Sequence, residues 1–156
     1  MRLLKTLLIT VIALAVTGSA FAAKTRDEAV RTMAGTARVA SGGKLTVIVT
    51  HQSGSTRFRV VIRYDVNVKS KTRLGFAAYP CRNNRCGAQS VAKTGSLSAR
   101  VHHVTFTGHV PVNKLGSSNK ACVFVQVRDH GPKGKDPGKL IRKRNGGKGV
   151  VICRNV

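Results

Sequence analysis

Histidines and cysteines are the side chains of this chain that could most readily do chemistry. His102, His103 and His109 lie close together in the sequence, and histidine serves both as a metal ligand and as an acid–base group. On a β-strand, however, His103 and His109 would share a face but stand about 20 Å apart, while His102 would point to the opposite face. This spacing favours separate surface histidines, so we predict no catalytic residue, no metal site and no cofactor.

Acidic residues are too few for most carboxylate chemistry. The sequence contains Asp27, Glu28, Asp65, Asp129 and Asp136, and none of them is patterned as a close pair within a strand. No nucleophile-elbow motif is present, although a Ser-His-Asp site stays open because its members converge in space rather than in sequence. The enzyme alternative is a secreted ribonuclease, in which two histidines and a lysine would act on a phosphodiester. We expect that the protein is not an enzyme.

The four cysteines are predicted to form two disulfides. An exported protein meets an oxidising compartment, which favours pairing of its cysteines. A zinc site would need short cysteine pairs, which only Cys81 and Cys86 provide, since Cys122 and Cys153 are 31 residues apart. If the last two strands pair antiparallel, Cys122 faces Cys153, and Cys86 closes a short loop with Cys81. The alternative joins Cys81 or Cys86 to Cys122.

Basic residues crowd the stretch 129–148, which is long for a loop between two strands. Its cluster Arg142-Lys143-Arg144 would meet phosphate or sulfate groups as point charges and bidentate forks. Two further arginines belong to the short loop that begins after Cys81. The predicted ligand-binding residues are Lys133, Lys135, Lys139, Arg142, Lys143, Arg144, Lys148, Arg82 and Arg85. The alternative is a solvated, mobile loop that only increases solubility.

The aromatic residues give little support for the stacking of nucleic-acid bases. Tyr79 is the one ring on the parity opposite Phe76, and single-strand binders need exposed rings. The rings at alternating positions that favour the core are Phe58, Tyr64, Phe76, Phe106 and Phe124. We therefore expect contact with backbone or lipid phosphates rather than reading of a base sequence.

Positive charge dominates the composition. The 156 residues include 28 Lys and Arg against 5 Asp and Glu, which gives a formal net charge of +23. Because acids are so few, most cations must be balanced by solvent ions or by an acidic partner. A chain of this length can bury enough surface for one core, so we predict a single folded domain.

The N-terminus has the order of a secretory signal peptide. Arg2 and Lys5 precede an apolar run over 7–16, and Ala20-Phe21-Ala22 fits a cleavage site. This run has 10 residues, whereas a membrane-spanning helix needs roughly 20. We predict a signal peptide over 1–22 and a periplasmic or secreted mature chain without a transmembrane segment. Removal of the signal peptide would lower the charge from +23 to +21, because it contains Arg2 and Lys5 and no acid.

Most of the remaining sequence alternates between apolar and polar residues, as strands do. The exception is the N-terminal segment 23–43, where a capping-box pattern at Thr25-Arg26-Asp27-Glu28 predicts a short helix over about 26–34. A turn is predicted at 52–55 and a bulge or strand break at His102-His103. The predicted strands cover about 45–49, 58–69, 73–79, 97–101, 104–110, 121–128 and 149–154.

Short strands at this spacing predict an all-β domain over 44–156, with the basic loop at 129–148. We expect a small antiparallel sandwich or barrel with two disulfides. An immunoglobulin-like topology is compatible with the number of strands, although the cysteine and aromatic spacing of true immunoglobulin domains is missing.

These features together predict an exported, basic binding protein for polyanions. Its partner would be a phosphate-rich envelope glycolipid or polymer, an acidic polysaccharide, or extracellular nucleic acid bound without sequence specificity. A structural or protein-interaction module of the cell envelope, with an acidic protein as partner, is the alternative. The secreted ribonuclease ranks below both.

Overall fold

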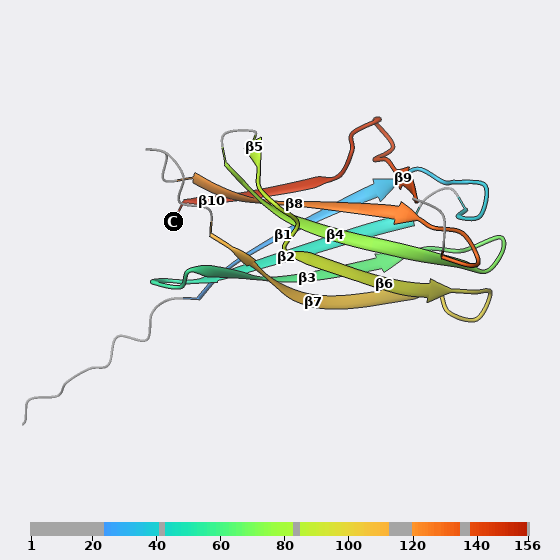
Figure 1. Ribbon diagram of the computed structural model, residues 1–156, viewed down its shortest axis with the longest axis horizontal. Coiled ribbons are helices and arrows are strands. Elements are labelled where there is room, and N and C mark those ends of the chain that lie inside the picture. The colour runs from blue at the N-terminus through green and yellow to red at the C-terminus, as the bar shows by residue number, and fades with distance from the viewer. Residues whose placement is uncertain (1–23, 41–42, 83–84, 113–119, 135–137, 156) are drawn as a thin grey trace, which may run out of the picture.

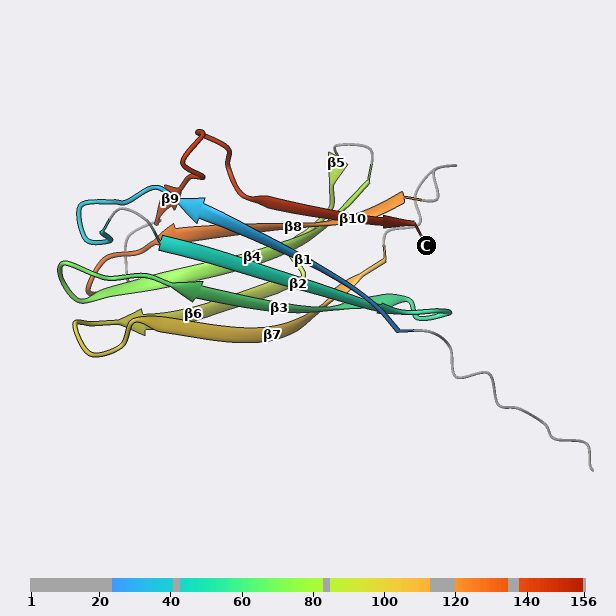
Figure 2. The same ribbon diagram turned by 180° about the vertical axis from the view of Figure 1, so that it is seen from behind.

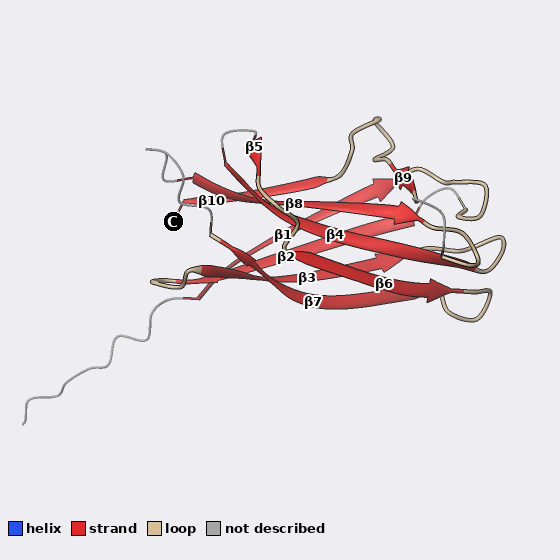
Figure 3. Cartoon of the chain, in the orientation of Figure 1, coloured by secondary structure: helices blue, strands red, loops and turns tan. Residues whose placement is uncertain are grey.

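The computed structural model describes residues 24–40, 43–82, 85–112, 120–134 and 138–155. The predicted signal peptide lies outside these residues. Within them the chain forms strands and turns and contains no helix (Figure 3). The strands are β1 (Lys24–Met33), β2 (Gly43–Gln52), β3 (Arg57–Asp65), β4 (Thr72–Arg82), β5 (Arg85–Cys86), β6 (Val91–Leu97), β7 (His103–Pro111), β8 (Lys120–Asp129), β9 (Lys139–Ile141) and β10 (Val150–Asn155).

Two antiparallel sheets pack face to face (Figures 1 and 2). The first sheet has the order β1-β2-β3-β7. In the second sheet β8 and β4 are central: β10 and β9 pair with the outer edge of β8, and β5 and β6 pair with the outer edge of β4. The prediction of an all-β domain is therefore confirmed, and the architecture is a sandwich.

Alternation of residue types explains which side of each strand is buried. Along β3, every second residue from Phe58 to Tyr64 is buried, whereas Arg59 and Arg63 between them are exposed. Along β8, every second residue from Ala121 to Val127 is buried. The inward residues of both sheets form one hydrophobic cluster, which is the core of the domain.

The strand order departs from the immunoglobulin arrangement. Strands β1, β2 and β3 are consecutive in the chain and neighbours in one sheet. In an immunoglobulin domain the third strand lies in the opposite sheet.

The β2–β3 hairpin itself was predicted, and its turn contains Gly54 with a φ of 78°, a conformation that glycine adopts without strain.

The predicted helix over 26–34 is wrong, because residues 26–33 belong to β1. Pairing with β2 is continuous from Lys24, opposite Gln52, to Met33, opposite Gly43. The residues of the expected capping box follow the period of a strand: Arg26 forms an ion pair with Glu28, two residues along, at 3.0 Å. A helix this short is marginal on its own, so ten paired residues and a buried Met33 outweigh the local capping signal.

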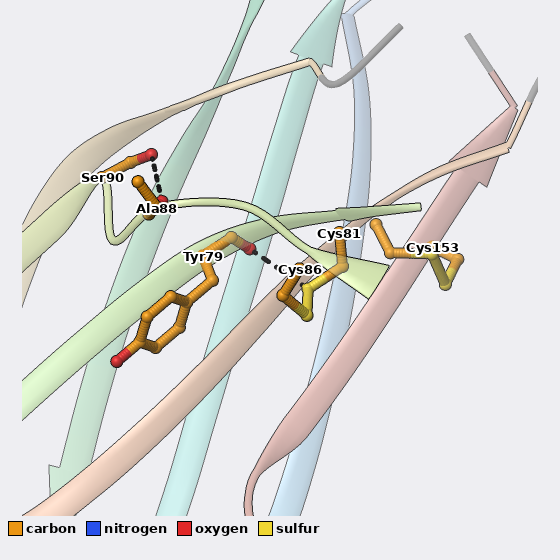
Figure 4. The surroundings of a disulfide bond; sticks show 7 residues. Tyr79, Cys81, Cys86, Ala88, Ser90 and Cys153 are labelled. Atoms are coloured by element: carbon orange, nitrogen blue, oxygen red, sulfur yellow. Dashed lines mark hydrogen bonds between the residues drawn. A yellow bond between two sulfur atoms is a disulfide. The ribbon is translucent and has the colours of Figure 1, made fainter. Parts of the chain in front are cut away.

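The disulfides are Cys81–Cys86 and Cys122–Cys153, as predicted (Figure 4). Cys122 pairs in register with Cys153 across β8 and β10, which confirms that the last two long strands are antiparallel neighbours. Cys81 is in register with both Cys86 and Cys122. All four cysteines therefore lie in one row across the second sheet, and the two bonds reinforce adjacent strand pairs at the same level.

A strand break separates β6 from β7, but it lies earlier than the predicted break at His102-His103, because residues 98–101 form a turn rather than the predicted strand. β6 ends at Leu97, and a tight turn follows in which Ser98 and Val101 exchange backbone hydrogen bonds of 3.1 and 3.4 Å. β7 then begins at His103 in the other sheet. The turn thus carries the chain from one layer of the sandwich to the other.

Candidate functional site

The stretch predicted as a basic loop is anchored to strands on both sides. Its residues 138–148, called the basic segment below, include β9, which pairs with the end of β8 and places Ile141 in the core at 1% exposure. The chain then reaches the first sheet, where Ala34 N donates to Arg142 O at 2.7 Å and Arg144 N donates to Thr32 O at 3.1 Å. The basic segment therefore joins the two sheets along one edge of the sandwich.

A tight turn follows this crossing and limits the freedom of the basic side chains. Lys143 N donates to Gly147 O at 2.8 Å, and Gly146 N donates to Lys143 O at 2.8 Å. Gly146 has a φ of 86°, which explains why glycine occupies this position. Arg142 Nη1 donates to Gly146 O at 3.1 Å. The side chains of Lys139, Arg142, Arg144 and Lys148 are exposed, and that of Lys143 is half-buried.

The other predicted ligand-binding residues do not join the basic segment. Lys133 is exposed in the turn after β8, and Lys135 lies outside the described residues. Arg85 is exposed on β5, where it pairs with Arg82 of β4. Lys139 of β9 lies at the level of Leu74, which is eight residues back along β4, so Arg85 stands about 26 Å from the basic segment. Arg82 itself is only 8% exposed, so it contributes little to the basic surface.

Acidic side chains neutralise few of these charges. Three ion pairs occur among the described residues: Arg26–Glu28, Arg63–Asp65 and Arg154–Asp27. The hydrogen bonds from Arg63 and from Arg154 hold the pKa values of Asp65 and Asp27 below their usual range. In the described part of the chain, no residue of the basic segment has an acidic partner.

The fourth described acid, Asp129, is buried at 4% exposure and serves the fold. Burial alone would raise its pKa, but hydrogen bonds from the hydroxyls of Thr72 and Thr36 and from the Gly131 amide, together with the charge of Arg38, hold the pKa below its usual value. The carboxylate is therefore ionised, and its oxygens accept hydrogen bonds from Thr72, Thr36 and Gly131 inside the protein. It balances no cation of the basic segment.

The aromatic prediction was wrong for one ring. Phe124 shares the outward face of β8 with Cys122, and its ring lies 6.0 Å from that of Tyr79 on β4. Beside this pair is a groove of about 480 Å³ on the outer face of the second sheet, whose lining includes Tyr79, Lys93 and Arg128. Tyr79 Oη donates to Gln89 Oε1 at 3.1 Å, so the ring is held in place. Sequence reasoning missed this groove because β6, which contributes Lys93 to the lining, was not among the predicted strands.

The three histidines near the start and end of β7 stay apart. His103 and His109 are exposed on the same face of the strand, as expected, and stand next to Asp65 and Arg59 of β3. His102 is exposed just before β7. Within the described ranges, no group of three histidine, cysteine or acidic side chains converges as a metal site would require.

Comparison with known proteins adds no assignment. Neither a protein-family model, nor a curated protein, nor a solved structure matches this chain. In the residues that the structure describes, no helix is long and apolar enough to cross a membrane. The function must therefore be argued from the charges and their placement.

Proposed function

We propose that this protein is an exported, strongly basic β-sandwich that binds polyanions along the basic segment. The observation that carries the proposal is the fixed display of cations there. Ten residues, 139–148, hold five Lys or Arg and no acid, and their backbone is bonded to β8 on one side and to the end of β1 on the other.

Anchoring supports binding over the alternative of a loosely solvated loop. A mobile loop must lose conformational freedom when it binds, and this cost reduces its affinity. Here the crossing from Lys139 to Arg144 is already fixed by strand pairing, so less order has to be gained on binding. The exposed guanidinium groups can also form bidentate bonds with phosphate, sulfate or carboxylate.

The spacing of the charges favours a polymer over a small ion. From Lys139 to Arg144 the near-extended chain spans about 17 Å, which can face several charges of a polyanion. No strand of the described residues presents a row of exposed rings for base stacking. We therefore propose contact with the charged backbone of the polymer and no reading of a base sequence.

The salt dependence of binding tests the proposal. Fluorescence anisotropy with duplex DNA would compare the parent with an Arg142→Gln/Arg144→Gln/Lys148→Gln variant, whose side chains are all exposed. The slope of log affinity against log salt is negative, and each lost phosphate contact makes it less steep by about 0.9. We therefore expect the slope of the variant to be flatter than that of the parent by up to about 2.7. The charge-matched control is Arg85→Gln/Lys93→Gln/Arg100→Gln, which removes exposed cations along the β5–β6 edge.

The control slope should stay close to that of the parent. Equal flattening in both variants would mean that diffuse charge binds the polymer and that the basic segment has no special role. The same titration with lipopolysaccharide and with an acidic polysaccharide would rank the ligands at about 0.15 M salt, where exposed contacts are largely screened. Release of all three polymers at that salt would contradict the proposal and favour the structural or protein-interaction module.

A further inference from the structure

A separate hollow lies on the outer face of the first sheet, at the end where β2 turns into β3. Its volume is about 390 Å³, and every residue that lines it has a polar or basic side chain. Three basic side chains, Arg57, Arg59 and His109, line it together with hydroxyl and amide groups that include Thr50 and Gln52. No acidic residue lines the hollow.

Strand register brings these donors together. Arg59 of β3 is directly opposite Thr50 of β2 on one side and His109 of β7 on the other. Directly opposite residues on one face of a sheet have Cβ atoms about 5 Å apart, so three donor groups stand in one row. Arg57 is two residues along β3 and therefore points to the same face.

The hairpin that walls the hollow is fixed from within. His51 is buried, its ring packs edge-on against Phe58 at 5.2 Å, and its Nε2 lies 2.9 Å from Ser55 O. Ser55 N donates to Gln52 O at 2.9 Å, and Arg57 N donates to Ser55 Oγ at 3.2 Å. The backbone that carries Arg57 is thus set before any ligand arrives.

The two arginines of the hollow differ from Arg63 and Arg26 of the same sheet. Arg63, on the same face of β3, is engaged by both oxygens of Asp65, and Arg26 is engaged by Glu28. Arg57 and Arg59 have no acidic partner among the described residues. Two unneutralised guanidinium groups beside hydroxyls and an imidazole make a site for an oxyanion.

We propose that this hollow binds a single phosphate or sulfate ester group, as a site distinct from the basic segment. Arg59 and Arg57 would hold the oxyanion with bidentate bonds, Thr50 would add a hydroxyl donor, and His109 would add a ring N–H donor. The hollow is larger than one oxyanion, which leaves room for the first atoms of the molecule that carries the ester.

Inorganic sulfate is the appropriate probe, because it is a divalent oxyanion with the same tetrahedral arrangement of oxygens as a phosphate or sulfate ester. Backbone amide shifts would be followed by NMR during titration of the purified protein at low ionic strength. We expect sulfate to shift amides of the β2–β3 hairpin and of β7 around His109. Arg59→Gln should weaken binding about tenfold, since a bond to a charged group is lost.

Arg63→Gln is the matched control, since it removes the same charge from the same face of β3 at a position already paired with Asp65. It should change sulfate affinity by less than about twofold. His109→Ala should also weaken sulfate binding, because it removes the imidazole that stands directly opposite Arg59 in the hollow. Equal losses in Arg59→Gln and Arg63→Gln, or no shifts at the hairpin, would overturn the proposal.

Competition then identifies the source of the ester. Displacement of sulfate by glucose 6-phosphate would assign a soluble ester, and displacement by vesicles that contain phosphatidic acid would assign a lipid headgroup; displacement by neither would contradict the proposal. The Arg142→Gln/Arg144→Gln/Lys148→Gln variant should bind sulfate here as the parent does. Sulfate titration therefore tests the hollow alone, whereas the salt dependence of binding to duplex DNA tests the basic segment. Either proposal can be contradicted without affecting the other.

Discussion

One buried carboxylate, Asp129, holds together three parts of this acid-poor fold. Thr72 at the start of β4 donates to it, Thr36 of the β1–β2 connection donates at 2.7 Å, and Gly131 N of the turn after β8 donates at 3.0 Å. Thr36 Oγ1 in turn accepts a hydrogen bond of 3.1 Å from Val39 N. Loss of the carboxylate would therefore disturb both sheets at the same end of the sandwich.

The expected cost follows from these three bonds. Each hydrogen bond to a charged group contributes about 1.5–3 kcal/mol, and such terms do not add fully, so Asp129→Ala should lower the free energy of unfolding by about 4 kcal/mol. Asp129→Asn keeps the shape and one carbonyl oxygen but places an amide nitrogen opposite one donor hydroxyl. That hydroxyl can rotate to accept, so we expect a cost of about 1–2 kcal/mol.

Urea unfolding measures these changes, and its pH dependence tests the charge. Because the folded-state pKa of Asp129 is lowered, its contribution is present above the unfolded value of about 3.9 and is lost as the pH falls through the folded value. Asp27 and Asp65 also have lowered pKa values, so the parent should lose stability steadily below about pH 4. The Asp129→Asn variant should lose less stability in acid than the parent, because only Asp27 and Asp65 then contribute to the loss.

Asp65→Ala is the control for this experiment, because Asp65 is partly exposed and pairs with an exposed Arg63. It should cost less than about 1 kcal/mol at neutral pH. If Asp129→Ala costs no more than Asp65→Ala, or if Asp129→Asn keeps the full acid dependence of the parent, then the carboxylate does not act as inferred.

Two further predictions concern the disulfides and the enzyme alternative. Replacing Cys122 and Cys153 with serine should lower the free energy of unfolding by about 3.7 kcal/mol, against about 2 kcal/mol for the Cys81–Cys86 pair, because these bonds close loops of 31 and 5 residues. Urea unfolding compares the two variants, and equal losses would contradict this argument. RNA should not be cleaved by the protein, because His103 and His109 stand six residues apart on β7. Cleavage that disappears in a His103→Ala or His109→Ala variant would favour the ribonuclease.

Strands and disulfides could be read from the sequence where burial affects only one face. β3 carries arginines at one parity and large apolar residues at the other, so its register has one solution. A different argument placed Cys122 opposite Cys153: when β8 and β10 pair antiparallel, the start of one strand faces the end of the other. These predictions depend on contacts between neighbouring strands, which the period of two already encodes.

Errors arose where local signals compete with tertiary pairing. Thr25 to Glu28 has the composition of a helix start, yet the segment is used as the edge strand β1 because β2 offers ten residues of pairing. Phe124 was assigned to the core because an aromatic ring usually is, although Val123 and Val125 already fill the inward positions of β8. No property of the single residue distinguishes these cases.

The basic residues of the candidate site were predicted from the sequence, but the strand pairing that anchors them was not. Arg142, Lys143 and Arg144 stand out as charge, but the chain around them was predicted as a long loop between two strands, with a mobile loop as the alternative. The signal that was missed is the pair Leu140-Ile141, whose burial draws the segment against β8. Arg82 could not have been identified as buried from its type, since arginine is almost never covered unless it is paired.

Scarcity of acid links the stability of this fold to its surface. The acids of the described residues are already engaged: Asp27 ties β1 to β10 through Arg154, Glu28 and Asp65 pair with arginines of their own strands, and Asp129 joins three segments. None is left to balance the basic segment or the hollow at Arg59. A polyanion that binds the native state would relieve the repulsion among these cations, so it should stabilise the protein as well as associate with it. Acid would act in the opposite way, because it protonates the carboxylates of Asp27, Asp65 and Asp129, which hold these segments together.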